Sequence, residues 1–146
     1  MDKRRWIVVG IDFSPGAERA LVRAAELAHE IGASLACVHA YEEPPSAPLR
    51  SDQSGAARSL LDDASRLVAA RFPNLKMQCF ARRGAPWEKL ANVAYEVGAE
   101  LIVVGACGEH GRLHPSFLGS VTTRVAALSE RSVLVVPAPE LETLSR

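Results

Sequence analysis

The chain has 146 residues, 48% of them hydrophobic, and its 17 basic side chains are balanced by 17 acidic ones. A chain of this length folds as one ordinary domain with a single core, here expected to span residues 1–146. With a net charge of zero, the protein lacks the broad positive field that non-specific nucleic-acid binding requires, so no nucleic-acid partner is expected.

The sequence shows neither a targeting signal nor a membrane segment. The apolar stretch over residues 6–10 is followed by Asp12, which makes it too short for the apolar region of a signal peptide. No run approaches the roughly 18 apolar residues of a membrane helix. The three cysteines, Cys37, Cys79 and Cys107, form no Cys-x-x-Cys pair and no even-numbered framework. We therefore expect a cytoplasmic protein with no membrane contact.

The first elements predicted are a strand and an amphipathic helix. A short β-branched run over residues 6–11 predicts the strand, and the turn that follows places Ser14 as a cap before Pro15 at the first helical position. Apolar residues recur every three or four positions over residues 17–31, which is typical of a helix with one buried face. Gly32 is the predicted end of this helix.

The same alternation of strand and helix continues along the chain. Further strands are predicted over residues 34–39, 76–81, 101–105 and 133–137, and further helices over residues 54–71, between Pro86 and Gly98, and over residues 120–129. Parallel neighbours need right-handed crossovers, so this order predicts a parallel sheet covered on both faces. The continuous apolar runs agree, since strands buried on both faces do not alternate. We therefore predict a single doubly wound α/β domain with five parallel strands and four helices.

Two of these strands end in residues suited to ligand binding. In open parallel sheets, ligands bind outside the carboxyl ends of the strands, where the strand order reverses. The first strand is followed by Asp12, and the fourth by Gly105 and Gly108. Gly119 and Ser120 follow at a helix start, where unpaired N–H groups can face an anion. The pattern predicts a polyphosphate site, supported by Thr122, Thr123 and Arg112. The alternative is that the glycines only turn the chain and that Ser120 only caps the helix.

The loop between these glycines offers two other chemistries. Cys107, His110 and His114 have the spacing Cys-x2-His-x3-His, which can place three ligands around zinc, but nothing predicts the supporting groups that such ligands need. Cys107 also follows a strand as a nucleophile elbow does, but Glu109 stands where that motif requires glycine. We therefore expect neither a metal ion bound by these side chains nor cysteine catalysis.

Several chemically active side chains elsewhere are assigned to packing or to solvent. Cys37 and Cys79 lie in predicted strands and are expected to be small core residues. His39 ends the second strand near the predicted crevice, where packing is the default and ligand contact the alternative. Arg82 and Arg83 follow the third strand and are expected in a solvated turn.

The chain resembles the universal stress protein family over nearly its whole length. The similarity lies in VVGIDFSPGAERAL, VHA, GAELIVVGACGEHG and LGSVTTRVAALSERSVLVVP, which begin at Val8, Val38, Gly98 and Leu118. Its most specific part is the glycine motif of the family's ATP-binding branch, with two residues between the first glycines, nine before the third, and then Ser or Thr. Here the longer spacer has ten residues, 109–118, and includes Pro115. Connecting loops tolerate such insertions, and the alternative is that the extra residue displaces the backbone donors.

The resemblance implies an ATP site in which Mg²⁺ is held mainly by the phosphates. Asp12 would contact the nucleoside end, and the backbone near Val38 would face the adenine. Gly105 and Gly108 would lie along the ribose and the phosphates. The phosphate tail would be held by Gly119, Ser120, Val121 and Thr122. No general base is placed against the phosphates, so we expect no enzyme, with ATP hydrolysis very slow at most.

The resemblance also implies the strand order 3-2-1-4-5 and a homodimer formed through the last strand, from Val133 to Val136. An apolar, uncharged edge strand invites pairing with another chain. The protein would act as a stress-response regulator towards a protein client that the sequence does not identify. The alternative is the family's other branch, a dimeric interaction module that binds no nucleotide. The two differ in whether the loop over residues 109–118 closes on phosphate.

Overall fold

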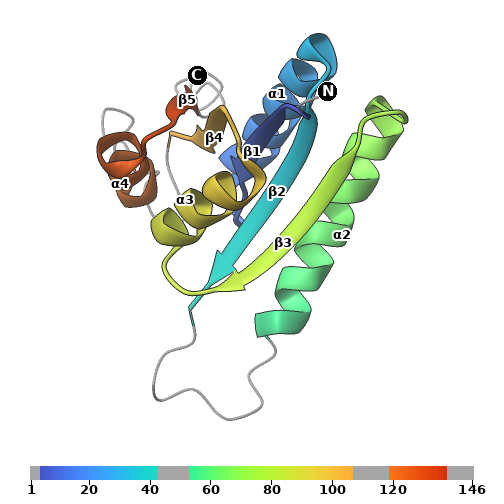
Figure 1. Ribbon diagram of the computed structural model, residues 1–146. Helices are drawn as coiled ribbons and strands as arrows, with labels where there is room; N and C mark the ends of the chain where they lie inside the picture. The colour runs from blue at the N-terminus through green and yellow to red at the C-terminus, as the bar shows by residue number, and fades with distance from the viewer. Residues whose placement is uncertain (1–3, 43–52, 107–118, 138–146) are drawn as a thin grey trace, which may run out of the picture.

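Five parallel strands and four helices alternate along the part of the chain that the structure describes. This computed structural model describes residues 4–42, 53–106 and 119–137. The strands pair in the order β3-β2-β1-β4-β5, every neighbouring pair parallel (Figure 1), which confirms the predicted class and strand order. In chain order the elements are β1 (Trp6–Gly10), α1 (Pro15–Ile31), β2 (Ser34–Tyr41), α2 (Gln53–Arg71), β3 (Met77–Arg83), α3 (Pro86–Val97), β4 (Leu101–Gly105), α4 (Ser120–Leu128) and β5 (Ser132–Val136).

The helices cover the two faces of the sheet in pairs. Side chains of α1 and α2 pack on the face to which Ile7 and Val9 of β1 point. Those of α3 and α4 pack on the opposite face, to which Val8 points. The central strands β1 and β4 are buried on both faces, which explains their continuous apolar runs. This double core holds the carboxyl ends of β1 and β4 in place.

The helix ends follow local chemistry at some positions and tertiary contacts at others. Gly32 and Gly98 end α1 and α3 in the left-handed conformation, with φ of 71° and 68°, as predicted. Ser14 occupies the N-cap position of α1, but its side chain makes no capping hydrogen bond. Its hydroxyl instead donates to the Asp12 carboxylate. The N-cap of α4 is Gly119 rather than Ser120, which is the first helical residue.

The pair β2 and β3 extends further than predicted. Both strands continue for two residues past the expected ends, because the backbone of each finds partners in the other up to Tyr41 and Arg83. The N–H of Gly84 then donates to the carbonyl of Tyr41 over 2.9 Å.

The prediction of a solvated turn at Arg82 and Arg83 is therefore wrong, because both residues belong to β3. Arg82 lies over the ring of Phe80 and forms a 3.2 Å ion pair with Glu96.

The two cysteines in strands differ in their surroundings. Cys37 is completely buried beside α1 and α2, which confirms its prediction as a core residue. Cys79 is exposed, so the same prediction is wrong for it. The reason is topological, because β3 is an edge strand and lacks a neighbour on one side.

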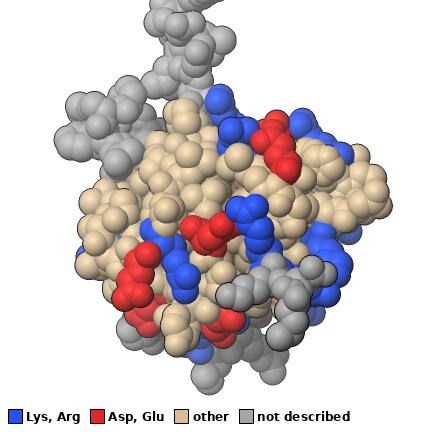
Figure 2. All heavy atoms as spheres, turned by 45° about the horizontal axis from the view of Figure 1, so that its top comes forward, with Lys and Arg blue, Asp and Glu red and all other residues tan. Residues whose placement is uncertain are grey.

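None of the helices in the described ranges combines the length and the apolar character needed to cross a membrane. On the face shown in Figure 2, acidic and basic side chains are interleaved and do not form a patch of one sign. Individual ion pairs, such as Arg5 with Glu100 at 2.7 Å, join side chains that are about half exposed. Such pairs contribute little to stability because solvent screens them.

Candidate functional site

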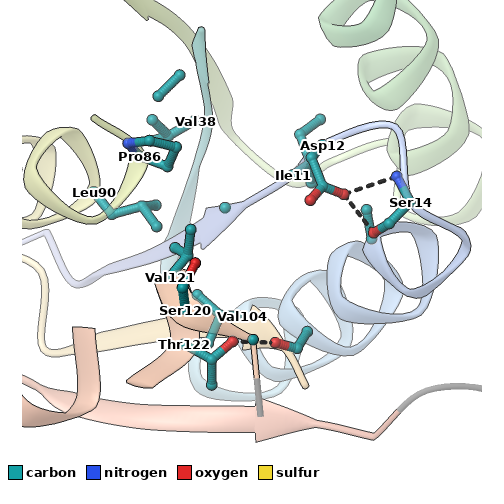
Figure 3. A pocket seen from close by; sticks show the side chains of 15 residues that line it. Ile11, Asp12, Ser14, Val38, Pro86, Leu90, Val104, Ser120, Val121 and Thr122 are labelled. Atoms are coloured by element: carbon teal, nitrogen blue, oxygen red, sulfur yellow. Dashed lines mark hydrogen bonds between the residues drawn. The ribbon is translucent and has the colours of Figure 1, made fainter. Parts of the chain in front are cut away.

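A pocket lies at the carboxyl ends of β1 and β4, the central strands between which the strand order reverses. This is the place where open parallel sheets bind ligands. Its walls come from the ends of β1, β2 and β4 and from the first turns of α1, α3 and α4 (Figure 3). The lining residues are Gly10, Ile11, Asp12, Ser14, Ala17, Val38, Ala40, Pro86, Leu90, Val104, Gly105, Gly119, Ser120, Val121 and Thr122. Of the residues predicted for the site, Asp12, Val38, Gly105, Gly119, Ser120, Val121 and Thr122 line this pocket. Thr123 does not line it, and Gly108 and Arg112 lie outside the described residues.

Asp12 forms one wall of the pocket in a fixed orientation. Its Oδ1 accepts a 2.8 Å hydrogen bond from the backbone N–H of Ser14 and a second from the Ser14 hydroxyl. The other carboxylate oxygen points towards the pocket (Figure 3). Ser14 therefore positions Asp12 and leaves one oxygen for a ligand hydroxyl. The sequence assigned Ser14 to helix capping, so this supporting role was missed.

A second wall is formed by the end of β2, which extends past the end of β1. Along β2, the backbone groups of even-numbered residues face β1, as the 2.9 Å bond from the N–H of Ile11 to the carbonyl of Val38 shows. Pairing between the two strands stops at Gly10 and Val38. The next even residue, Ala40, therefore directs its N–H and C=O towards the pocket without a partner from β1. Unpaired backbone groups inside a pocket are hydrogen-bonding sites for a ligand.

A side-chain contact of His39 lies where the next bond of the ladder between β1 and β2 would form. Its ring Nδ1 lies 2.9 Å from the carbonyl oxygen of Ile11, so that nitrogen carries the hydrogen and donates. If the ladder continued, the carbonyl of Ile11 would accept a hydrogen bond from the N–H of Ala40. His39 is buried and its ring contacts Phe13 edge to face, and it does not line the pocket. Of the two interpretations left open for His39, the structure supports packing.

The third wall is the first turn of α4, close to the end of β4. The N–H of Gly119 is already used, because it donates to the carbonyl of Ala106 over 2.7 Å. The first bond within the helix runs from the N–H of Thr123 to the carbonyl of Gly119, so the N–H groups of Ser120, Val121 and Thr122 have no partner in the helix. These three groups, with the positive end of the helix dipole, can receive an anion.

The threonine hydroxyls do not point where the sequence suggested. Thr122 is buried, and its Oγ1 donates to the carbonyl of Gly105 over 2.6 Å. The hydroxyl of Thr123 donates to the carbonyl of Gly119 over 3.0 Å. The expectation that both hydroxyls face phosphate is therefore wrong. The buried hydroxyl of Thr122 must be hydrogen-bonded, and the end of β4 supplies its acceptor. The exposed hydroxyl of Thr123 bonds back to the helix N-cap. The exposed hydroxyl of Ser120 stays available.

Apolar side chains complete the pocket and were not anticipated. Pro86 and Leu90, one turn apart on α3, lie opposite Asp12 (Figure 3). Leu90 comes so close to β1 that a Cβ added to Gly10 would lie 2.8 Å from its Cδ2. Gly10 thus allows α3 to pack onto the sheet. The signal available in the sequence was the helical spacing of Pro86 and Leu90, which identifies a shared face but not what that face meets.

The described residues contain no group of three or more His, Cys, Asp or Glu side chains able to hold a metal ion. Asp12 is the one acidic side chain among the pocket residues named above. The loop residues Cys107, His110 and His114, considered as zinc ligands, lie outside the described ranges, as does Arg112.

The chain is similar to universal stress proteins along most of its length. A protein of this family from Mycobacterium tuberculosis is 35% identical over 150 residues, and the alignment covers 93% of this chain and 98% of that protein. One from Mycolicibacterium smegmatis is 32% identical over 139 residues, but the chain spans only 46% of its length.

Solved structures of the same family share the fold. A universal stress protein crystallised in complex with cAMP is 30% identical, with a TM-score of 0.73 over 93% of this chain and 98% of that one. A universal stress protein from Archaeoglobus fulgidus in complex with dAMP is 25% identical, with a TM-score of 0.72 over 92% and 98% of the two chains. Residues 3–137 match the universal stress protein family as a whole. With its pocket at the reversal of the strand order, the chain belongs to the universal stress protein family.

Proposed function

We propose that the chain binds an adenine nucleotide in this pocket, with ATP and Mg²⁺ as the working ligand. The observation that carries the proposal is a pair of backbone groups, the N–H and C=O of Ala40, that find no partner among the described residues. They line the same pocket as the first turn of α4, whose N–H groups also have no partner in that part of the chain. The donor and acceptor of Ala40 suit a base, and the N–H groups of α4 suit an anion. The cAMP and dAMP complexes of two relatives support an adenine nucleotide as the ligand class.

The base is expected to bind through the backbone of Ala40 between Val38 and Pro86. A neighbouring donor and acceptor on the protein match adenine, which presents the N6 amino group and the N7 acceptor on one edge. Guanine presents two acceptors, O6 and N7, on the corresponding edge, so one contact would be lost. We therefore expect ATP to bind more tightly than GTP. The family resemblance assigned this role to the backbone near Val38, whose carbonyl already accepts from Ile11.

The phosphates are expected to lie against α4. The N–H groups of Ser120, Val121 and Thr122 would donate to phosphate oxygens, and the hydroxyl of Ser120 would add a fourth donor. Asp12, held by Ser14, would accept from the sugar. Gly105, at the end of β4, and Gly119, at the N-cap of α4, would leave space for the phosphates because they carry no side chain. The role of Gly108 rests on the family resemblance alone.

Hydrolysis is expected to be very slow or absent. The pocket residues named above include no His, Lys or Cys, and Asp12 is already held by two hydrogen bonds from Ser14. A general base must reach the attacking water. The remaining oxygen of Asp12 is expected to accept from the sugar, which leaves none of the pocket residues named above to act as that base. We therefore propose a nucleotide-responsive regulator that acts on a protein client. No release of phosphate from ATP over hours would agree with this proposal.

A matched pair of variants at Ser120 tests the phosphate site. Ser120→Pro removes one backbone N–H at the first helical position, where proline is favoured, and Gly119 before it is already extended with ψ of 158°. Ser120→Ala removes only the hydroxyl. A hydrogen bond to a charged group is worth about 1.5–3 kcal/mol, so Ser120→Pro should weaken ATP binding roughly 10- to 100-fold. Ser120→Ala loses the hydroxyl but keeps the N–H, so it should weaken ATP binding less than Ser120→Pro, which loses both donors, and the difference between the two variants reports the N–H alone.

The binding measurement is calorimetric titration of ATP with Mg²⁺ into protein freed of bound nucleotide, with GTP as the comparison. Equal affinities for the wild type and Ser120→Pro would show that α4 does not hold the phosphates. No binding of either nucleotide to the wild type would favour the second candidate, a dimeric interaction module without nucleotide. That candidate rests on the edge strand β5, whose apolar side chains are partly exposed.

A further inference from the structure

Two cysteines that are 42 positions apart in the sequence stand side by side in the sheet. Cys37 of β2 and Cys79 of β3 are register partners in the parallel ladder. Neighbouring strands are about 4.7–4.9 Å apart, which falls within the Cα separation of about 4.4–6.8 Å that a disulfide spans. Both cysteines are reduced in this structure.

Both side chains also point to the same face of the sheet. Cys37 belongs to the core formed with α1 and α2. The Sγ of Cys79 lies 3.8 Å from the carbonyl oxygen of Leu61 in α2, to which its thiol donates a weak hydrogen bond. Because register partners on one face are direct neighbours, the two thiols are adjacent on the face of the sheet that α2 partly covers.

The surroundings give the two thiols different reactivities. Cys79 is exposed on the edge strand, while Cys37 is completely buried. A hydrogen bond from the Cys37 thiol lowers the pKa of Cys79, against opposing effects of partial burial and of Asp62. The hydrogen bond to Cys79 and burial together raise the pKa of Cys37 well above its ordinary value. The thiolate is the reactive form, so Cys79 is the nucleophile and Cys37 its buried partner.

We propose that Cys37 and Cys79 form a reversible oxidation site that reduces hydroperoxides and closes to an intramolecular disulfide. The Cys79 thiolate attacks the peroxide, an S–O bond forms as the O–O bond breaks, and the leaving oxygen takes a proton to become an alcohol or water. Cys37 then attacks the resulting sulfenic acid at sulfur, the S–S bond forms, and water leaves. Two thiols are oxidised and one hydroperoxide is reduced.

The ladder geometry favours a bond that is easily reduced again. Disulfides prefer Cβ atoms about 3.5–4.5 Å apart, which is less than the spacing of neighbouring strands, so closure has to draw β3 towards β2. Strained disulfides are the labile ones that serve as switches. An edge strand can make this adjustment because it has a paired neighbour on one side only.

The test treats the full-length protein with hydrogen peroxide, blocks remaining thiols with iodoacetamide, and maps peptides without reduction. Before the blocking step, the intact mass should be lower by two hydrogens. The peptide map should show one pair joined through Cys37 and Cys79, and dithiothreitol should reverse both changes. Cys107→Ser serves as the matched control and should behave as the wild type. A disulfide that includes Cys107, a link between two chains, or Cys79 oxidised to sulfinic acid with Cys37 still reduced would each overturn the proposal.

Two variants separate the roles of the two thiols. Cys37→Ala should stop the reaction at the Cys79 sulfenic acid, which dimedone traps. Cys79→Ser changes an exposed residue and should fold normally, and its Cys37 should stay reduced at the same peroxide concentration. Oxidation of Cys37 at the wild-type rate in Cys79→Ser would contradict the assignment of Cys79 as the nucleophile. The peptide map of the wild type does not depend on either variant.

Discussion

At the scale of single residues, the pocket depends on groups whose neighbours determine which atoms are left for a ligand. Asp12 keeps one carboxylate oxygen for the pocket because Ser14 occupies the other. The carbonyl of Gly105 is taken by the buried hydroxyl of Thr122. Only the polar atoms of a site that are not already hydrogen-bonded within the fold can therefore bind a ligand.

Replacing Gly10 tests how closely α3 approaches the sheet. In Gly10→Ala the new Cβ would meet Leu90, a flexible side chain whose available space is the pocket. We expect a loss of stability of about 1–3 kcal/mol together with a clear loss of ATP affinity. In the double variant Gly10→Ala with Leu90→Val, affinity should recover, because the two residues are coupled through contact.

Urea unfolding and calorimetric titration of the same samples check both parts of this prediction. Full affinity in Gly10→Ala would mean that Leu90 moves away from the pocket rather than into it.

The acidity of Cys79 gives a second prediction at this scale. Because the hydrogen bond from Cys37 lowers the pKa of Cys79, its alkylation rate should rise with pH at a lower midpoint in the folded protein than in urea. Cys37→Ala removes the donor and should move the midpoint upwards, since burial and Asp62 then act unopposed. Mass-spectrometric rates of iodoacetamide labelling across the pH range measure both midpoints. A midpoint that does not move in Cys37→Ala would exclude the thiol hydrogen bond as the cause.

At the scale of elements, α4 is attached to β4 by a small number of polar contacts. The N–H of Gly119 bonds to Ala106, and the hydroxyl of Thr122 bonds to Gly105. Val125 adds the apolar contact in the middle of the helix. These bonds place the helix N-terminus at the pocket, although the chain between residues 106 and 119 lies outside the described ranges.

The neighbouring threonines of α4 offer a matched comparison. Thr122→Val keeps the shape of a buried side chain but leaves the carbonyl of Gly105 without its donor, so unfolding free energy should fall by about 1–3 kcal/mol. Thr123→Val changes an exposed residue and should stay within about 0.5 kcal/mol of the wild type. Chemical denaturation compares the two variants. Equal effects would show that the Thr122 bond does not anchor α4.

At the scale of the whole molecule, the sheet ends in two edge strands with different surfaces. β3 carries charged and polar side chains, including Arg82 and Arg83, that discourage pairing. β5 carries Val133, Leu134 and Val135, all apolar and partly exposed. The sheet therefore has one edge suited to pairing with a second copy, and we keep the homodimer through β5 as a proposal.

Two variants of Val135 test the dimer without breaking the fold. The carbonyl of Val136 faces β4, where it accepts from Ala106, so the N–H of the preceding residue, Val135, faces the open edge. Val135→Pro removes that N–H and should give a monomer, because proline on an outer edge blocks pairing but not the inner ladder. Val135→Ala keeps the N–H and should stay a dimer. Sedimentation velocity at micromolar concentration decides, and a monomeric wild type would contradict the proposed interface.

Much of the fold could be predicted from short stretches of sequence. The helical repeats, the stops at Gly32 and Gly98 and the continuous apolar runs of β1 and β4 are local signals, and each was confirmed. The placement of Asp12 and Gly119 at one pocket also followed, because carboxyl ends of parallel strands share one edge of a sheet.

The sequence by itself determined which segments form strands and helices, since propensity, periodicity and turn chemistry act over a few residues. Only the tertiary structure decided which polar atoms stay available. Ala40 faces the pocket because β2 extends past β1, and Thr122 turns inward because β4 supplies an acceptor. Cys37 and Cys79 are neighbours because of the register between β2 and β3. These features depend on pairing between residues far apart in the chain, which no local pattern records.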